Sequence, residues 1–179
     1  MILIFASVFL VQNLKEKQSA QPENPKTIIP PEEIPENEFK DLNLLYYGDE
    51  NKYRLDTTLK HVIQDDVEHL FFQELEAALL DSSQVEGEIL QHISTSKGWM
   101  KTSAGVVHLN GSIVLEGNDI QLFPDNLDID LNQGEFLAQG SVVLNGNNFE
   151  VTAQEMSSDF QLRKIHLSGR PTLIVKIGD

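Results

Sequence analysis

The chain contains no cysteine, and only 13 Lys and Arg stand against 28 Asp and Glu in its 179 residues. Without cysteine the sequence excludes a disulfide framework, a thiolate metal site, a cysteine nucleophile and a lipid-modified cysteine. The formal net charge of −15 argues against nucleic acid as a partner, because an acidic surface is repelled by phosphate backbones. The hydrophobic fraction of 40% is nevertheless too high for a wholly disordered acidic chain. We therefore expect a folded acidic domain.

Sequence signatures of catalysis and of metal or phosphate binding are also missing. The histidines form no H-E-x-x-H pair, and there is no glycine-rich phosphate loop or serine nucleophile elbow. Residues 128–134 match a calcium loop only in part, because the glycine falls one place late and Gln139 stands where a bidentate Glu belongs. Asp65 and Asp66 are adjacent, so on a strand their carboxylates would point to opposite faces. We predict no enzyme activity, no catalytic residue, no metal and no cofactor.

The N-terminus carries a short apolar run, residues 2–11, which is interrupted only by Ser7 and precedes the first charge at Lys15. A membrane-spanning helix needs about 20 apolar residues. A signal peptide needs a basic start and a small-residue cleavage site, and neither is present. We interpret residues 1–14 as a hydrophobic membrane anchor, truncated if the natural chain begins upstream of Met1, with a buried terminal strand as the alternative.

The next segment, residues 15–42, holds five of the seven prolines among Glu, Lys, Gln and Asn. Such a composition predicts an extended, solvated linker. From residue 42 onward, 21 acidic and nine basic residues leave a net charge of −12. Most of the negative charge therefore belongs to the domain that follows the linker.

Residues 43–179 alternate apolar and polar side chains between Gly, Asn and Asp turn signals, and this pattern predicts an all-β domain. One part is ambiguous, because Phe72, Leu75 and Leu79 have helical spacing. Residues 73–81 fit either a short helix or an irregular strand, and the sequence leaves the structure of residues 73–92 open.

A repeat of 29 residues organises the domain, since Gly111, Gly140 and Gly169 follow one another at that spacing and their neighbours match in the same register. In each unit the residues at alternate positions are apolar and those between them are polar, as Val142 and Ser141 illustrate. A unit has room for two strands and two turns, and it cannot hide its own apolar face. We predict stacked two-strand layers around a continuous apolar interior.

The pattern resembles the LptC/LptA/OstA-like family of lipopolysaccharide transport proteins, and the membrane-anchored LptC branch in particular. The resemblance rests on layers of the form apolar-x-x-Gly-x-apolar-x-apolar, the strand at residues 149–156, and the segments KYRL (52–55) and TSKGW (95–99). A hydrophobic N-terminus and a linker precede these motifs. The similarity covers most of residues 46–175.

This resemblance implies an open β-jellyroll whose apolar interior holds acyl chains, driven there by burial worth about 25 cal/mol per Å². The implied lipid-binding residues are the apolar ones that the repeat places on the inward face: Val107, Leu109, Ile113, Leu115, Ile120, Leu122, Phe136, Val142, Leu144, Phe149, Val151, Ile165, Leu167 and Leu173. The net charge of −12 is unfavourable for lipid phosphates, so a headgroup is expected to stay outside the interior.

The resemblance also implies partners and a location. The anchor would cross the inner membrane once and dock on the permease subunits of an ABC transporter, with the β domain in the periplasm. The terminal strand edge, Leu173, Ile174, Val175 and Ile177, would pair with an LptA-like bridge protein through main-chain hydrogen bonds. The implied function is to pass lipopolysaccharide or a related glycolipid from the transporter to that partner.

Two other classes fit the same pattern less completely. A structural or adhesive β-solenoid would have a closed core and no lipid cargo, and an array of that kind usually contains more repeats. A carbohydrate-active β-helix enzyme needs carboxylates clustered on one accessible face, whereas those in this sequence are scattered.

Overall fold

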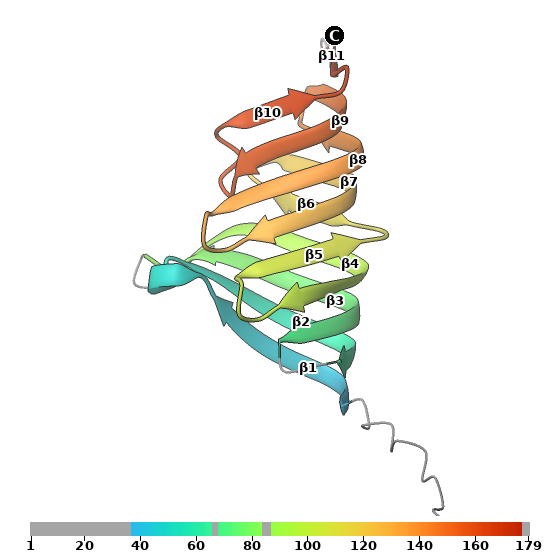
Figure 1. Cartoon of the computed structure of the whole chain (residues 1–179). Helices are drawn as coiled ribbons and strands as arrows, with labels where there is room; N and C mark the ends of the chain where they lie inside the picture. The colour runs from blue at the N-terminus through green and yellow to red at the C-terminus, as the bar shows by residue number, and fades with distance from the viewer. Residues whose placement is uncertain (1–36, 66–67, 84–86, 177–179) are drawn as a thin grey trace, which may run out of the picture. The chain divides into compact units, whose positions relative to one another are not determined.

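The computed structural model describes residues 37–65, 68–83 and 87–176, which form an all-β unit of 11 strands (Figure 1). The predicted all-β class is confirmed. The predicted anchor at residues 1–14 and most of the predicted linker lie outside the described residues. Within the ranges that are described, no helix has the length and apolar character needed to cross a membrane.

All strands of the unit pair antiparallel with their neighbours. A short 3-10 helix, η1 (Asp49–Asn51), separates the first two strands. The strands are β1 (Asn37–Tyr47), β2 (Tyr53–Gln64), β3 (His69–Asp81), β4 (Glu88–Lys101), β5 (Val106–Asn110), β6 (Val114–Gly117), β7 (Ile120–Asp130), β8 (Glu135–Asn145), β9 (Phe149–Asp159), β10 (Ile165–Ser168) and β11 (Thr172–Val175).

The order of strands in the sheet follows the chain, from β1 through β5 and then from β7 to β10. The pairings among β4, β5, β7 and β6 close into a small four-stranded barrel, and the other strands pack outside it. Figure 1 shows the strands as successive rungs, with β1 at one end of the unit and β10 and β11 at the other.

The 29-residue unit is a pair of strands, of which the first is either interrupted or shifted in register and the second is continuous. β5 and β6 occupy successive stretches of the same neighbours, since β4 pairs with β5 over 97–101 and with β6 over 92–94. β10 and β11 likewise follow one another along β9. β8 occupies the equivalent position as a single strand with a register shift between Gln139 and Val142.

Each of these strands is interrupted or shifted at a glycine of the repeat. Gly111, Gly140 and Gly169 have positive φ angles of 93°, 93° and 72°. Fifteen residues before each glycine, the neighbouring strand leaves one polar residue out of the pairing: Ser96, Asp125 and Gln154. These positions form a line across the sheet, here called the bend line, along which the strand pairing is interrupted.

Gly140 shows why the bend line needs glycine. The Asp125 carboxylate folds over it and accepts a hydrogen bond from the Ser141 backbone N–H at 2.7 Å. A Cβ at position 140 would lie 2.6 Å from Asp125 Oδ2, so a side chain cannot fit while this bond is kept. Positive φ adds to the preference for glycine. The glycine that recurs in the repeat is therefore required by the backbone conformation at this position.

The first strands reach the same bend without glycine. Asp41 and Glu74 have φ angles of 50° and 53°. Glu74 and the facing Lys60 are both left out of the β2–β3 pairing, which continues in the same register, and the kink at Glu74 turns both Phe72 and Leu75 inward. The helical spacing seen in the sequence arises from this kink, and residues 73–81 belong to strand β3.

The sheet begins earlier than the sequence predicts. β1 starts at Asn37 and pairs with Gln64, so residues 37–42 belong to the sheet and not to the linker. Glu38 and Lys40 are exposed on this edge strand, and their charge concealed the strand pattern. Leu42 and Leu44, which follow, point toward the core.

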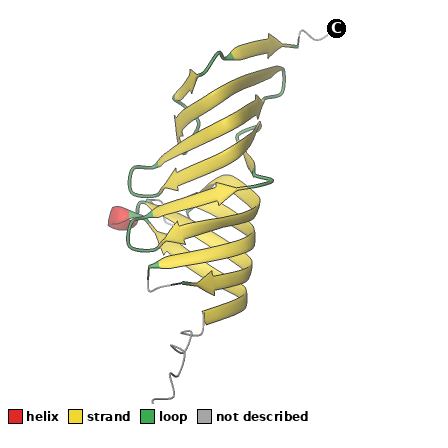
Figure 2. Ribbon diagram, turned by 45° about the vertical axis from the view of Figure 1, so that its right-hand side comes forward, coloured by secondary structure: helices red, strands yellow, loops and turns green. Residues whose placement is uncertain are grey.

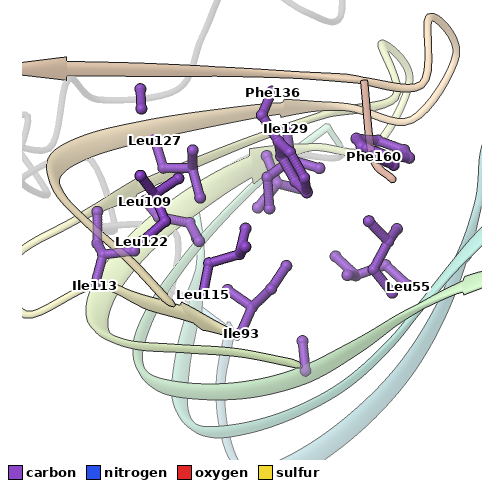
Figure 3. Packing of buried hydrophobic residues seen from close by; sticks show 14 of the residues in the cluster. Leu55, Ile93, Leu109, Ile113, Leu115, Leu122, Leu127, Ile129, Phe136 and Phe160 are labelled. Carbon is purple, nitrogen blue, oxygen red and sulfur yellow. The ribbon is translucent and has the colours of Figure 1, made fainter. Parts of the chain in front are cut away.

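Inward side chains from both sides of the bend line share one core. Figure 3 shows Ile93, Leu115 and Leu122, from one side, pointing toward the same space as Leu127 and Phe136 from the other. Figure 2 shows the curvature of these strands. Bending therefore lets each strand contribute two apolar stretches to a common interior.

The substitution Gly140→Ala tests the bend line. It should lower the free energy of unfolding by about 1–3 kcal/mol, because it adds strain at positive φ and displaces Asp125. Chemical denaturation measures the change. Ser141→Ala is the control: it keeps the bonded N–H and should stay within about 0.5 kcal/mol of wild type. Equal stability of all three proteins would contradict this account of the repeat.

Candidate functional site

The structure places most of the predicted lipid-binding residues in one apolar cluster. The buried ones are Val107, Leu109, Ile113, Leu115, Leu122, Phe136, Val142, Leu144 and Val151. The partly buried ones, packed against the same cluster, are Ile120, Phe149, Ile165 and Leu167. The parity derived from the repeat thus gives the side of the sheet for these residues.

Leu173 is the exception. It is 62% exposed, although its cross-strand partner Val151 is buried. The reason is its position: β11 pairs with β9 alone, and no later described strand covers it. Ile174 and Val175 are exposed by 50% and 59%. The fourth residue predicted for the partner edge, Ile177, lies outside the described residues.

The interior is filled by the protein's own side chains. Phe136 is 1% exposed, and Leu115 and Leu122 are completely buried. An alkyl chain cannot enter beside them unless these side chains move, because packed cores leave few voids larger than water. The site is therefore a continuous apolar core and not a preformed open channel at this depth.

Phe160 closes one side of the interior and was not predicted. Its ring packs edge-on against Tyr53 at 4.8 Å between centroids and lies 4.7 Å from the Phe136 ring. The buried Gln91 amide donates a hydrogen bond to the Phe160 carbonyl at 3.1 Å. Phe160 lies in the turn after β9, at the place that the buried Leu131 takes 29 residues earlier, and it was missed because the alternation of the strands does not extend into these turns.

The N-terminal half of the core was also missing from the predicted site. Its buried members include Leu55, Leu59, Leu75, Leu79 and Ile93. Alternation over residues 53–59 marks the first two in the sequence. The kink at Glu74 conceals Leu75 and Leu79, because it changes which alternate positions face inward in the middle of β3, and Ile93 lies on β4.

The core continues to both ends of the described unit without a polar cap. On β1, Leu42, Leu44 and Tyr46 face the core but are only partly buried, and Ile165 and Leu167 do the same on β10. Stacked-layer proteins normally end in layers with a polar outer face. Here the apolar interior reaches the surface at the two terminal strands.

Asp130, in the segment that partly matches a calcium loop, has backbone partners. Asp130 Oδ1 accepts hydrogen bonds from the backbone N–H groups of Asn132 and Gln133 at 2.9 Å each, which is an Asx turn. Across residues 37–65, 68–83 and 87–176, no group of three or more His, Asp or Glu side chains could hold a metal ion. The chain matches no protein-family model and no curated protein.

Asp159 anchors the turn that carries Phe160. Burial raises the pKa of this carboxyl, but hydrogen bonds outweigh burial and leave the pKa lowered overall. The donors are the Arg163 backbone N–H at 2.7 Å, the Arg163 guanidinium at 3.1 Å and the Lys164 backbone N–H at 3.4 Å. The ionised carboxylate is therefore the form that stabilises the turn.

Asp159→Asn tests this turn through pH. A carboxyl with a lowered pKa stabilises the fold above its unfolded pKa, about 4, and loses that contribution as pH falls through the folded pKa. The variant should be less stable than wild type at pH 7, and the difference should shrink below about pH 4. Urea denaturation at several pH values measures it.

Glu76→Gln is the control for that titration, since Glu76 is an exposed carboxyl on β3 without a hydrogen-bond partner among the described residues. A stability difference for Asp159→Asn that stays constant from pH 7 to pH 3 would contradict the assigned role of the carboxylate.

Proposed function

We propose that this unit is an open β-jellyroll that carries the acyl chains of lipopolysaccharide or a related glycolipid. In this proposal the chain is anchored in the inner membrane beside an ABC transporter and passes lipid through the periplasm to an LptA-like partner. The sequence resemblance supplies the transporter, the partner and the cargo. The single structural observation that supports the proposal is the apolar interior that reaches both terminal strands uncapped.

The terminal strands are suited to continuing the sheet into a second protein. β1 and β11 each pair with one described strand, so each has a free edge. Both carry exposed apolar residues, including Phe39 and Leu45 on β1 and Leu173 and Val175 on β11. A partner strand added there would extend the main-chain ladder and cover apolar surface. It would also join the two apolar interiors.

Lipid would enter at these ends. Phe149, Ile165 and Leu167 are inward-facing but only partly buried, so an acyl chain can contact them before deeper side chains move. Each buried CH₂ group of the lipid gains about 0.8 kcal/mol, which offsets the repacking of the core. No side chain has to do chemistry for this transfer.

A second candidate is a structural β-solenoid with a permanently closed core. The near-complete burial of Phe136, Leu115 and Leu122 favours it, because such packing needs no ligand. In that case the uncapped ends would serve only to join protein layers. Capture of lipid distinguishes the two candidates.

Photo-crosslinking of the full chain tests the cargo. A photoreactive residue at Phe149 or Leu167 should capture lipopolysaccharide in cells, whereas one at the outward positions Ser141 or Asn145 should not. Mass spectrometry of the adducts identifies the lipid. Equal capture at inward and outward positions, or capture at neither, would remove the carrier proposal.

The partner edge has a separate test. Leu173→Asp combined with Ile174→Glu should abolish pull-down of an LptA-like partner, because the added charges would be buried without a counter-ion. Ile89→Glu is the matched control: Ile89 is 52% exposed but lies on β4, away from the ends. Both proteins should keep the wild-type unfolding midpoint. Retained binding by the double variant would exclude this edge as the contact.

A further inference from the structure

A hollow of about 460 Å³ lies over strands β2, β3 and β4, lined mainly by outer-face side chains and also by the core residue Phe72. Phe71, which is 43% exposed, and Trp99 alternate along their strands with the buried Phe72 and Met100, so they belong to the outer face of the sheet. The volume falls within the range of about 300–1,000 Å³ that is usual for small-molecule sites.

Two parallel rows of side chains build the hollow. Ile63, Phe71 and Trp99 are direct cross-strand partners and form an apolar row. Two residues away on each strand, Gln73 and Lys97 are partners in a polar row that begins at His61 and ends at Asn110. Strands lie about 4.8 Å apart and rows about 7 Å apart, so three strands frame a patch the size of one six-membered ring.

The Trp99 ring is held in place from one side. It stacks on the His108 ring with 3.9 Å between centroids and 25° between planes. His108 Nδ1 lies 2.5 Å from Asp128 Oδ1, which fixes the imidazole in turn. An aromatic wall that is immobilised before binding loses little conformational entropy when a ligand stacks on it.

The charge in the hollow is opposite to that of the chain. None of its lining residues is Asp or Glu, although the chain has 28 acidic against 13 basic residues. Lys97 lines the hollow, and no carboxylate among the described residues pairs with it. His61 at the rim is bonded to Glu38 at 2.9 Å, which leaves Lys97 as the available cation. The site is complementary to an anion.

We propose that this hollow binds an anionic sugar. The apolar CH face of the ring packs against Trp99 and Phe71, the hydroxyls exchange hydrogen bonds with the Gln73 amide and Asn110, and the phosphate or carboxylate pairs with Lys97. A purely apolar acid would leave the amides without partners. The side chains assigned to the ligand all belong to the outer face of the sheet, so the proposal does not depend on the interior being the lipid site.

Intrinsic fluorescence gives a direct readout, because Trp99 is the only tryptophan of the chain. Titration of the full chain with glucuronate and with glucose 6-phosphate should change the emission saturably, with midpoints below about 10 mM. Neutral glucose should bind at least tenfold more weakly. Lys97→Met keeps the apolar stem and should weaken both anionic sugars at least tenfold.

Lys164→Met is the matched control, an exposed lysine in the turn after β9, and should bind like wild type. Far-UV circular dichroism verifies that each variant is folded. Equal midpoints for glucose and glucuronate, or for wild type and Lys97→Met, would overturn the proposal.

A final arm separates the two sources of such a sugar. Lipopolysaccharide micelles are compared with neutral detergent micelles in the same fluorescence assay. A Lys97-dependent response to lipopolysaccharide alone assigns the site to a lipid-borne sugar, and a response to the soluble anions as well assigns it to the sugar itself. A response to neither rejects the site.

Discussion

The fold depends on one constraint: each long strand must change direction at a fixed point, so that its two apolar stretches face the same interior. At Gly140 the Asp125 carboxylate of the neighbouring strand β7 occupies the space that a side chain would fill. It accepts a hydrogen bond from the Ser141 N–H. Gly111 repeats this contact, with Ser96 Oγ accepting from the Ser112 N–H at 3.3 Å. A straight strand could turn only one of its two apolar stretches toward the interior. The position of the bend line therefore determines where the core forms.

This constraint also explains which parts of the fold could be predicted. Where glycine marks the bend, the 29-residue spacing was readable and parity gave the correct inward face. Where Glu74 takes a positive φ angle in place of a glycine, the sequence carried no signal and the kink imitated helical spacing. The start of β1 was missed because charged residues on an edge strand resemble a linker. Phe160 was missed because it lies in a turn, beyond the alternation.

The outer hollow was out of reach for a different reason. Its two rows combine residues from 61 to 110, and each row exists only through the register of β2, β3 and β4. Lys97 and Trp99 lie within the TSKGW segment, but nothing in the sequence shows Phe71 and Gln73 beside them. Likewise, parity placed Leu173 inward, whereas its exposure follows from the lack of a further described layer.

The central claim is that acyl chains reach the common interior through its uncapped ends. Methyl NMR of the full chain with a glycolipid carrying a nitroxide on its acyl chain measures this directly. The account predicts that the inward methyls of Leu167 and Leu144 broaden, while those of Ile89, 52% exposed and on β4 away from the ends, remain sharp. Broadening confined to Ile89 and other exposed methyls would contradict it.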